Sequence, residues 1–366
     1  MKILHYTVND LQKKLHESDF WSTDILPITK HRALSHIHNP RAHGDDAVLF
    51  VGYNNGDIIG YLGVLPDKIY LEDKAHTMAW GSTLWVDPKH RGNRIGQLLV
   101  STASQYYDIC SSGVTWSGKM VADTSGNFMT LKTSKGVAFL MRSCCSYVLP
   151  KQFKRLRRIR PAFTIIDRTV NNLVELYSFF GKRGKTGFRP GNIEFITEID
   201  EQTDRFIRQH NNNALSKRTA QELNWIIKYP WIIPAPRRDT AQNRYFFSST
   251  SPRFFYLNVK VFDVNGNMAG FVMFKVKDNI LSIPFAYFTD EAIDDIIYLI
   301  CSIVFEMKID IFITYQNEII EKFSTNHLPY LYKKDLTLLY HKPNKLKDFD
   351  FSRCVFQDGE GDSAFT

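Results

Sequence analysis

The sequence has few cysteines and no long uninterrupted apolar run. Its 366 residues include five cysteines, an odd number, and none of their spacings matches a zinc knuckle or a redox pair. A fold that depends on disulfides is therefore not indicated, and a reducing, cytoplasmic location is expected. The N-terminal segment lacks the apolar core of a signal peptide, and no uncharged stretch reaches the length of a membrane span. We expect no membrane partner.

Patterns typical of metal sites and of nucleophilic catalysis are also missing. The histidines are scattered without metal-ligand spacing. Asp358, Glu360 and Asp362 resemble the start of a calcium loop, but no closing glutamate follows at the required position. No nucleophile and base occur at an informative spacing. We therefore expect no bound metal.

The composition is that of a soluble globular protein with a mild excess of positive charge. Hydrophobic residues make up 44% and charged residues 23%, and the formal net charge is +8. Part of this excess lies in the run KQFKRLRRIR at 151–160. We interpret the run as a solvated interdomain segment, with a nearby phosphate ligand as an alternative. No nucleic-acid motif accompanies it, so no nucleic-acid partner is expected.

Hydrophobic periodicity predicts an antiparallel meander in the first half of the chain. Helical spacing indicates short helices over 8–20 and 29–38. Two strands over 47–71 are joined by Asn54–Asn55–Gly56, a strong hairpin signal, and a third strand ends at Val86. An amphipathic helix follows, with an apolar face made by Ile95, Leu98, Leu99, Thr102, Ala103 and Tyr106.

After this helix the pattern predicts a strand at GVTWSGK, a short helix at GNFMTLKTSK and one or two strands over VAFLMRSCCSYVLP. Beyond the basic run we expect three helices, the last one capped by Ser216. Three strands follow over 254–288, then a helix capped by Asp290 and a strand at DIFITY. Helices, hairpin strands, helix and strand thus occur in both halves, which favours an α+β fold.

The segment WVDPKHRGNRIG, which joins the third strand to the amphipathic helix, has the composition of an anion site. The first turn of a helix leaves its N–H groups unpaired and carries the positive end of the helix dipole. Glycine lets a ligand approach the backbone, and arginine adds charge-assisted contacts to phosphate oxygens. These features together suit a pyrophosphate, although basic residues and glycine at an ordinary solvated helix start are also common.

In this context the segment resembles the signature of the GNAT superfamily of acyl-CoA-dependent N-acyltransferases, Gln/Arg-x-x-Gly-x-Gly/Ala, preceded by Val-x-Pro. Arg91 and Gly96 match the first and last positions of the signature, and Val86 and Pro88 match the preceding Val-x-Pro. Arg94 replaces the middle glycine, which leaves slightly less room for a pyrophosphate. The resemblance covers roughly residues 47–148.

The resemblance implies a set of residues that bind the acyl-CoA cofactor. The main chain of Leu84 and Val86 would hold the pantetheine arm, and Asn127 would lie near the thiol. The diphosphate would be held by the backbone amides of consecutive residues at the helix start, namely Arg91, Gly92, Asn93, Arg94, Ile95 and Gly96.

The catalytic groups of the family are not found at their usual places. Trp80 stands where many relatives carry a glutamate base, and Lys132 stands where many carry a tyrosine acid. Ser82 and Asp123 are weak candidates for polar groups near the reaction. For both, an ordinary hydrogen-bonding role is the more common alternative.

The predicted fold is α+β, with a GNAT-like mixed, largely antiparallel sheet flanked by helices and two such lobes in tandem. The predicted lobes are an acyl-CoA-binding domain over 1–150 and a second α/β lobe over 166–345. A basic linker over 151–165 joins them, and a C-terminal tail occupies 346–366. We interpret the second lobe as a degenerate repeat that has lost cofactor binding, with an unrelated α/β domain as the alternative.

The resemblance implies an N-acyltransferase that transfers acetyl from acetyl-CoA, or another acyl-CoA, to an amine of a small molecule, sugar nucleotide or peptide. Attack would be direct, in a ternary complex. Two alternatives remain: an inactive GNAT-like module that binds acyl-CoA or a partner, and a two-lobed cell-wall transferase that uses aminoacyl-tRNA. The sequence indicates neither the acceptor nor the oligomeric state.

Overall fold

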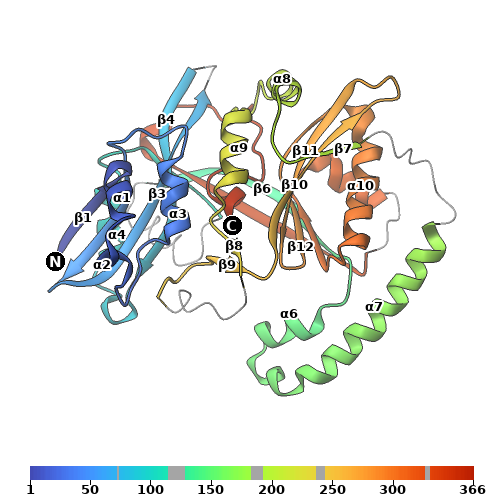
Figure 1. Ribbon diagram of the computed structural model, residues 1–366, viewed down its shortest axis with the longest axis horizontal. Coiled ribbons are helices and arrows are strands. Elements are labelled where there is room, and N and C mark those ends of the chain that lie inside the picture. Colours follow the sequence, from blue (N-terminus) through green and yellow to red (C-terminus); the bar gives the residue numbers. More distant parts are fainter. Residues whose placement is uncertain (72–73, 114–127, 183–192, 236–243, 326–329) are drawn as a thin grey trace. The chain divides into compact units, whose positions relative to one another are not determined.

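The computed structural model describes residues 1–366 except for 72–73, 114–127, 183–192, 236–243 and 326–329 (Figure 1). The chain divides into two compact units, and each is built from segments that are not contiguous in sequence. Unit 1 comprises residues 1–134, 198–254 and 337–366, and unit 2 comprises 135–197 and 255–336. In its described part, the chain has no helix that is both long and apolar enough to cross a membrane.

The sheet of unit 1 has the strand order β1-β2-β3-β4-β5-β14. Neighbouring strands are antiparallel except for β4 and β5, which run parallel. The strands are β1 (Lys2–Thr7), β2 (Ala47–Asn54), β3 (Asp57–Leu71), β4 (Lys74–Val86), β5 (Ile109–Ser112) and β14 (Tyr332–Pro343). The predicted meander of β2, β3 and β4 is confirmed, with the hairpin turn at Asn55 and Gly56 in the left-handed region.

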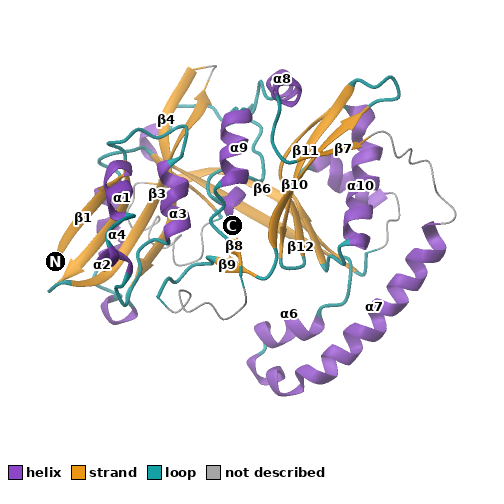
Figure 2. Ribbon diagram, in the orientation of Figure 1, coloured by secondary structure: helices purple, strands orange, loops and turns teal. Residues whose placement is uncertain are grey.

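The helices of unit 1 come from two of its three segments, residues 1–134 and 198–254 (Figure 2). They are α1 (Val8–Lys14), α2 (Ser18–Trp21), α3 (Lys30–Ile37), α4 (Ile95–Ala103), α8 (Glu201–His210) and α9 (Ala220–Lys228). Helix α4 buries Ile95, Gly96, Leu99 and Ala103, which pack on apolar residues of β2 and β3. The amphipathic helix predicted after β4 is confirmed. A two-stranded sheet of β8 (Ile233–Pro234) and β9 (Thr250–Ser251) completes the unit.

The sheet of unit 2 has the order β6-β13-β12-β11-β10-β7. Strands β12 and β13 run parallel to each other, and helix α10 connects them. The strands are β6 (Phe128–Leu140), β7 (Ile193–Ile196), β10 (Phe254–Phe262), β11 (Met268–Lys277), β12 (Ile280–Phe288) and β13 (Ile311–Thr314). The helices are α6 (Cys145–Gln152), α7 (Arg160–Lys182), α10 (Ile293–Glu306) and α11 (Asn317–Thr325). Each unit therefore contains an antiparallel meander, a connecting helix and a parallel strand.

Several predicted elements differ from the structure. The described part of GNFMTLKTSK lies in strand β6 and is not helical, and the latter part of VAFLMRSCCSYVLP forms helix α6. Helix α9 begins after Thr219, whose amide and hydroxyl both donate to the Glu222 carboxylate, so Ser216 is not its cap. Asp290 is not a helix cap either. It lies inside a 3-10 helix (Asp290–Ala292) that follows Thr289, and Ala292 is the residue that precedes α10.

The predicted lobes and the observed units divide the chain differently. The segment 151–165, predicted as a linker, carries a 3-10 helix at Lys154–Ile159 and the start of α7, and it belongs to unit 2. The tail 346–366 belongs to unit 1, as does the segment that holds α8 and α9. The fold class is confirmed as α+β, with largely antiparallel sheets flanked by helices.

Candidate functional site

The connection between β4 and α4 is a short ordered turn. A 3-10 helix at Pro88–His90 follows Asp87, whose carboxylate accepts a hydrogen bond from the Lys89 amide at 2.9 Å. The Asp87 amide donates to the Ile59 carbonyl on β3 at 2.9 Å. The turn is thereby anchored to the sheet, and it fixes where α4 begins.

The start of α4 has no side-chain cap. The residue before the helix, Arg94, has φ 58° in the left-handed region and gives no side-chain hydrogen bond to the first turn. The first N–H groups of a helix have no intrahelical acceptor, and they carry the positive end of the dipole. Residues 91–94 are exposed. This end of α4 can therefore accept an anion.

Gly92 and Arg94 determine the backbone shape of the segment that leads into α4. Gly92 has φ +91°, and a Cβ built there would meet nothing within 4 Å, so the space beside it is open. Arg94, which replaces the middle glycine of the signature, adopts a left-handed conformation that glycine favours. The substitution thus keeps a glycine-like backbone and adds a guanidinium. Asn93 lies between them in the same exposed stretch.

Leu84 and Val86 lie on β4 just after an irregularity in that strand. The pairing with β3 shifts between Tyr61 and Gly63, so that the Thr83 region carries an extra residue, and Thr83 itself has φ 31°. The Val86 carbonyl accepts a hydrogen bond from Arg91 Nε at 3.4 Å. On its other side β4 pairs with β5 through Ala79 and Trp80. Asp123 and Asn127 lie outside the described residues.

Ser82 is buried and anchors an arginine. Its Oγ accepts a hydrogen bond from Arg32 Nη2 at 2.6 Å and donates to the Gly63 carbonyl at 3.0 Å. Arg32, only 3% exposed, also donates to the Tyr245 hydroxyl at 2.9 Å and lies over the Trp231 ring at 3.6 Å. A buried cation held by hydroxyls and a ring was not predicted, because its partners lie far apart in sequence. Ser82 is thus an ordinary hydrogen-bonding residue in this structure, and its role near the reaction stays a prediction.

Trp80, at the usual position of the family's glutamate, is part of a buried charge network. Its Nε1 donates to Asp67 Oδ2 at 2.9 Å, and Asp67 also pairs with Arg41 and Arg218 at 2.6 and 2.9 Å. Although burial opposes ionisation, the two arginines hold the pKa of Asp67 below its ordinary value. A carboxylate therefore lies next to Trp80, but it is neutralised by two cations and is 1% exposed.

The C-terminal segment brings a second carboxyl group to the same buried region. Glu360 is fully buried, and its Oε1 accepts a hydrogen bond from Ser216 Oγ at 3.0 Å. Burial raises the pKa of Glu360 to about 7, against the lowering effect of Arg218. The neighbouring Gly361 has φ +67°, and its Cβ position lies 3.1 Å from the Trp80 ring. The segment whose acidic residues resemble the start of a calcium loop therefore packs into unit 1.

Lys132 and two further polar residues of unit 1 have structural partners. Lys132 Nζ donates to the Cys354 carbonyl at 3.2 Å and lies over the Phe356 ring at 4.5 Å, and burial lowers its pKa. Asn224 bonds both the amide and the carbonyl of Ile199. Tyr229 stacks on His38 with ring centroids 4.4 Å apart. Among the described residues, no three His, Cys, Asp or Glu side chains are placed to hold a metal ion.

Comparison with known proteins confirms the resemblance to GNAT proteins. Residues 13–110, which lie in unit 1, match the model of the acetyltransferase (GNAT) family. No curated protein matches the sequence.

Among solved structures, a protein of unknown function from Enterococcus faecalis, described as a probable N-acyltransferase, superposes with a TM-score of 0.52 at 9% identity. That match covers 94% of this chain and 73% of the other. N-myristoyltransferase from Saccharomyces cerevisiae with bound myristoyl-CoA gives a TM-score of 0.49 at 9% identity, covering 94% and 82%. A GCN5-related N-acetyltransferase from Anabaena variabilis gives 0.44 at 11% identity, covering 80% and 62%. The fold is therefore GNAT-like.

Proposed function

We propose that the protein is an acyl-CoA-dependent N-acyltransferase that transfers acetyl from acetyl-CoA to an amine. The observation that carries the proposal is the uncapped, exposed start of α4 directly after β4. Backbone amides from Arg91 to Gly96 would hold the diphosphate, and the arginine side chains would add charge-assisted contacts. The main chain of Leu84 and Val86 would hold the pantetheine arm. A small molecule, a sugar nucleotide or a peptide could supply the amine.

The chain's own groups would act by positioning rather than by a dedicated base. An amine held next to a thioester carbonyl gains most of its rate from orientation and from polarisation of that carbonyl by backbone amides. Trp80 and Lys132 stand at the usual base and acid positions, and both are tied to structural partners. The amine proton would therefore leave to water as the amide bond forms and the thiolate of CoA departs.

The proposal predicts that acetyl-CoA raises the unfolding temperature of the wild-type protein. A ligand present at 100 times its dissociation constant stabilises the native state by about 2.7 kcal/mol. Replacing Gly92 by valine should abolish this shift, because the branched side chain disfavours φ +91° and fills the open approach. The measurement is thermal unfolding with and without acetyl-CoA.

Gly266 supplies the matched control for this variant. It also has positive φ, +81°, with nothing within 4 Å of its Cβ position, and it lies in the turn between β10 and β11. Gly266→Val should carry a similar backbone cost and should keep the full acetyl-CoA shift. An unchanged shift in Gly92→Val, or no shift in the wild type, would contradict the proposed site.

A second candidate function is binding of acyl-CoA without turnover. The engagement of Trp80 with Asp67 and of Lys132 with Cys354 favours it, because neither usual proton carrier is replaced by a free group at the same position. Release of CoA with an amine from a broad acceptor panel would exclude it. A thermal shift without any CoA release would favour it over the transferase.

A further inference from the structure

The helical segment that follows β6 carries a concentrated positive charge. We define the basic arm as residues 153–174, which span the 3-10 helix Lys154–Ile159 and the part of α7 whose side chains are described. It contains six basic residues and one acidic residue. All six cations are exposed: Lys154, Arg155, Arg157, Arg158, Arg160 and Arg168. The arm therefore presents a strongly cationic surface in unit 2.

The one acidic residue of the arm does not offset this charge at the surface. Asp167 is 7% exposed, and its carboxylate accepts hydrogen bonds from Ser143 Oγ and from the amides of Cys145 and Ser146 at 2.6, 2.8 and 2.9 Å. Although burial opposes ionisation, these hydrogen bonds hold the pKa of Asp167 below its ordinary value. Asp167 thus caps the start of α6, and the side of α7 that carries it faces α6.

The opposite side of α7 is apolar and exposed. Ile165, Ile166 and Leu173 are 68%, 47% and 61% exposed. At 100° per residue these three positions fall within one arc of the helix, on the side away from Asp167. An apolar side chain gains free energy when it leaves water, so three of them exposed together on one face indicate a partner.

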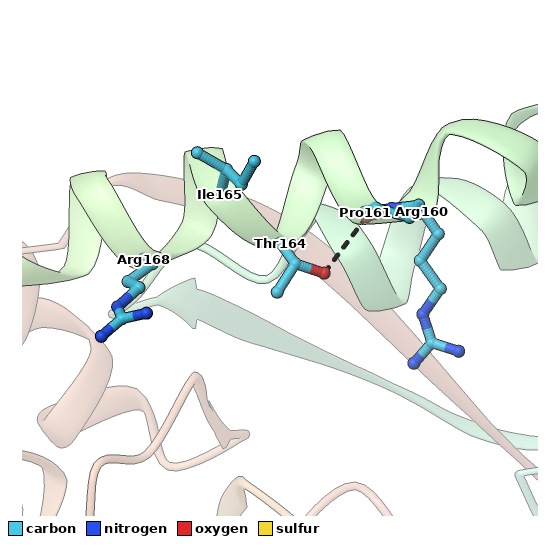
Figure 3. A pocket seen from close by; sticks show the side chains of 5 residues that line it. All are labelled: Arg160, Pro161, Thr164, Ile165 and Arg168. Atoms are coloured by element: carbon cyan, nitrogen blue, oxygen red, sulfur yellow. Dashed lines mark hydrogen bonds between the residues drawn. The ribbon is translucent and has the colours of Figure 1, made fainter.

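Arginines of α7 lie on another side of the helix than its exposed apolar residues. Arg160 and Arg168 line a pocket together with Pro161, Thr164 and Ile165. In Figure 3 both guanidinium groups point to one side of the helix and Ile165 points to the other. The long alkyl chains of arginine let the charged ends reach toward a polar surface beside the helix. A helix with an apolar face and cations on its other side has the pattern of a helix that lies in a membrane interface.

We propose that the basic arm binds the surface of an anionic lipid bilayer. The aliphatic side chains would enter the boundary between headgroups and acyl chains, and the arginines would pair with headgroup phosphates. A second copy of the chain would place six cations against six others. Nucleic acid would neutralise the cations but leave the aliphatic side chains against phosphate and water. The expectation of no membrane partner rested on the absence of an apolar span, which does not bear on binding at the surface.

Flotation of the full-length protein with lipid vesicles tests the proposal. Vesicles in which phosphatidylglycerol makes up about a third of the lipid should bind the protein, and pure phosphatidylcholine vesicles should not. The double variant Arg157→Glu and Arg158→Glu should bind the anionic vesicles at least roughly tenfold more weakly, since each basic residue contributes to attraction by the surface potential. Ile165→Ser with Leu173→Ser, which keeps the charge, should also weaken binding.

Lys333 and Lys334 supply the matched control. Both are exposed on β14, in the same chain but outside the arm, so Lys333→Glu with Lys334→Glu makes the same change in net charge. This control should bind as the wild type does, and circular dichroism would verify that all variants are folded. Equal binding to neutral and anionic vesicles, or equal loss in the control, would overturn the proposal. Binding to double-stranded RNA without binding to vesicles would also overturn it and would assign the surface to nucleic acid.

Discussion

At the scale of single residues, charged side chains lie deep inside unit 1. Arg32, Asp67, Arg218 and Glu360 are each 3% exposed or less, and each has a partner from a distant part of the sequence. A buried charge is tolerated only when partners compensate for lost hydration. The sequence indicated none of these pairings, because no local pattern marks residues that meet across hundreds of positions.

Glu360 predicts a pH dependence of stability. Its native pKa of about 7 lies above the ordinary 4.5, so the native state binds this proton more tightly than the unfolded state does. The corresponding stability is fully present below the ordinary pKa and is lost as pH rises through about 7. Glu360→Gln, which resembles the protonated form, should match the wild type at low pH and exceed it above neutrality by up to about 3 kcal/mol. Urea unfolding across pH measures the difference.

The exposed residue Glu318 provides the comparison for that experiment. Glu318→Gln should change the free energy of unfolding by a few tenths of a kcal/mol at most, about equally at every pH. A constant difference between the wild type and Glu360→Gln across the same range would show that folding does not raise the pKa of Glu360.

At the scale of elements, periodic segments were predicted correctly and elements with distant partners were not. The β2–β4 meander and α4 follow from alternation and from 3.6-residue spacing in their own sequences. Helix α6 begins where Asp167 accepts the Cys145 and Ser146 amides, so its N-terminal partner lies beyond the segment itself. The first part of β6, residues 128–135, was predicted as helix because this polar stretch has no clear period, whereas residues 137–140, which pair with β13, were predicted as strand.

Helix α8 allows a test of local capping. The Asp200 carboxylate accepts a hydrogen bond from the Thr203 amide at 2.9 Å and from its hydroxyl at 2.7 Å. Asp200→Ala should lower the free energy of unfolding by about 1 kcal/mol. Asp200→Asn should lower it much less, because asparagine also caps helices well. Chemical denaturation measures both. Equal losses in the two variants would assign the effect to the charge rather than to the cap.

At the scale of the molecule, the sequence predicted the fold class but not the division into units, and the phosphate site at Arg91–Gly96 stays a prediction. The alternation of polar and apolar residues in the strands and the Arg91–Gly96 signature are both patterns of residues that are close together in sequence. The assignment of residues 198–254 and 337–366 to unit 1 depends on side chains such as Trp231 and Phe365, which stack with centroids 4.7 Å apart. The similar order of meander, helix and parallel strand in both units supports the proposal that the second half is a degenerate repeat.

The discontinuous unit 1 predicts that residues 1–150 alone do not form a stable domain. That fragment would expose the surfaces of Arg32 and Trp80 that the later residues Tyr245 and Gly361 cover. We expect little near-ultraviolet circular dichroism and no cooperative thermal transition from the fragment, whereas the full chain should show both. A sharp transition in the fragment would favour the contiguous lobe of 1–150 over the observed unit.

The packing of Phe365 on Trp231 and of Gly361 on Trp80 has a consequence for how the protein is made. A ribosome releases residues in order, so the first strands emerge long before the segment that covers them. Contacts of such large sequence separation slow folding, because a long loop must close before they form. The apolar surface of the newly made N-terminal strands would therefore stay exposed until synthesis is complete. The yield of folded protein in cells should depend on chaperones that shield nascent chains.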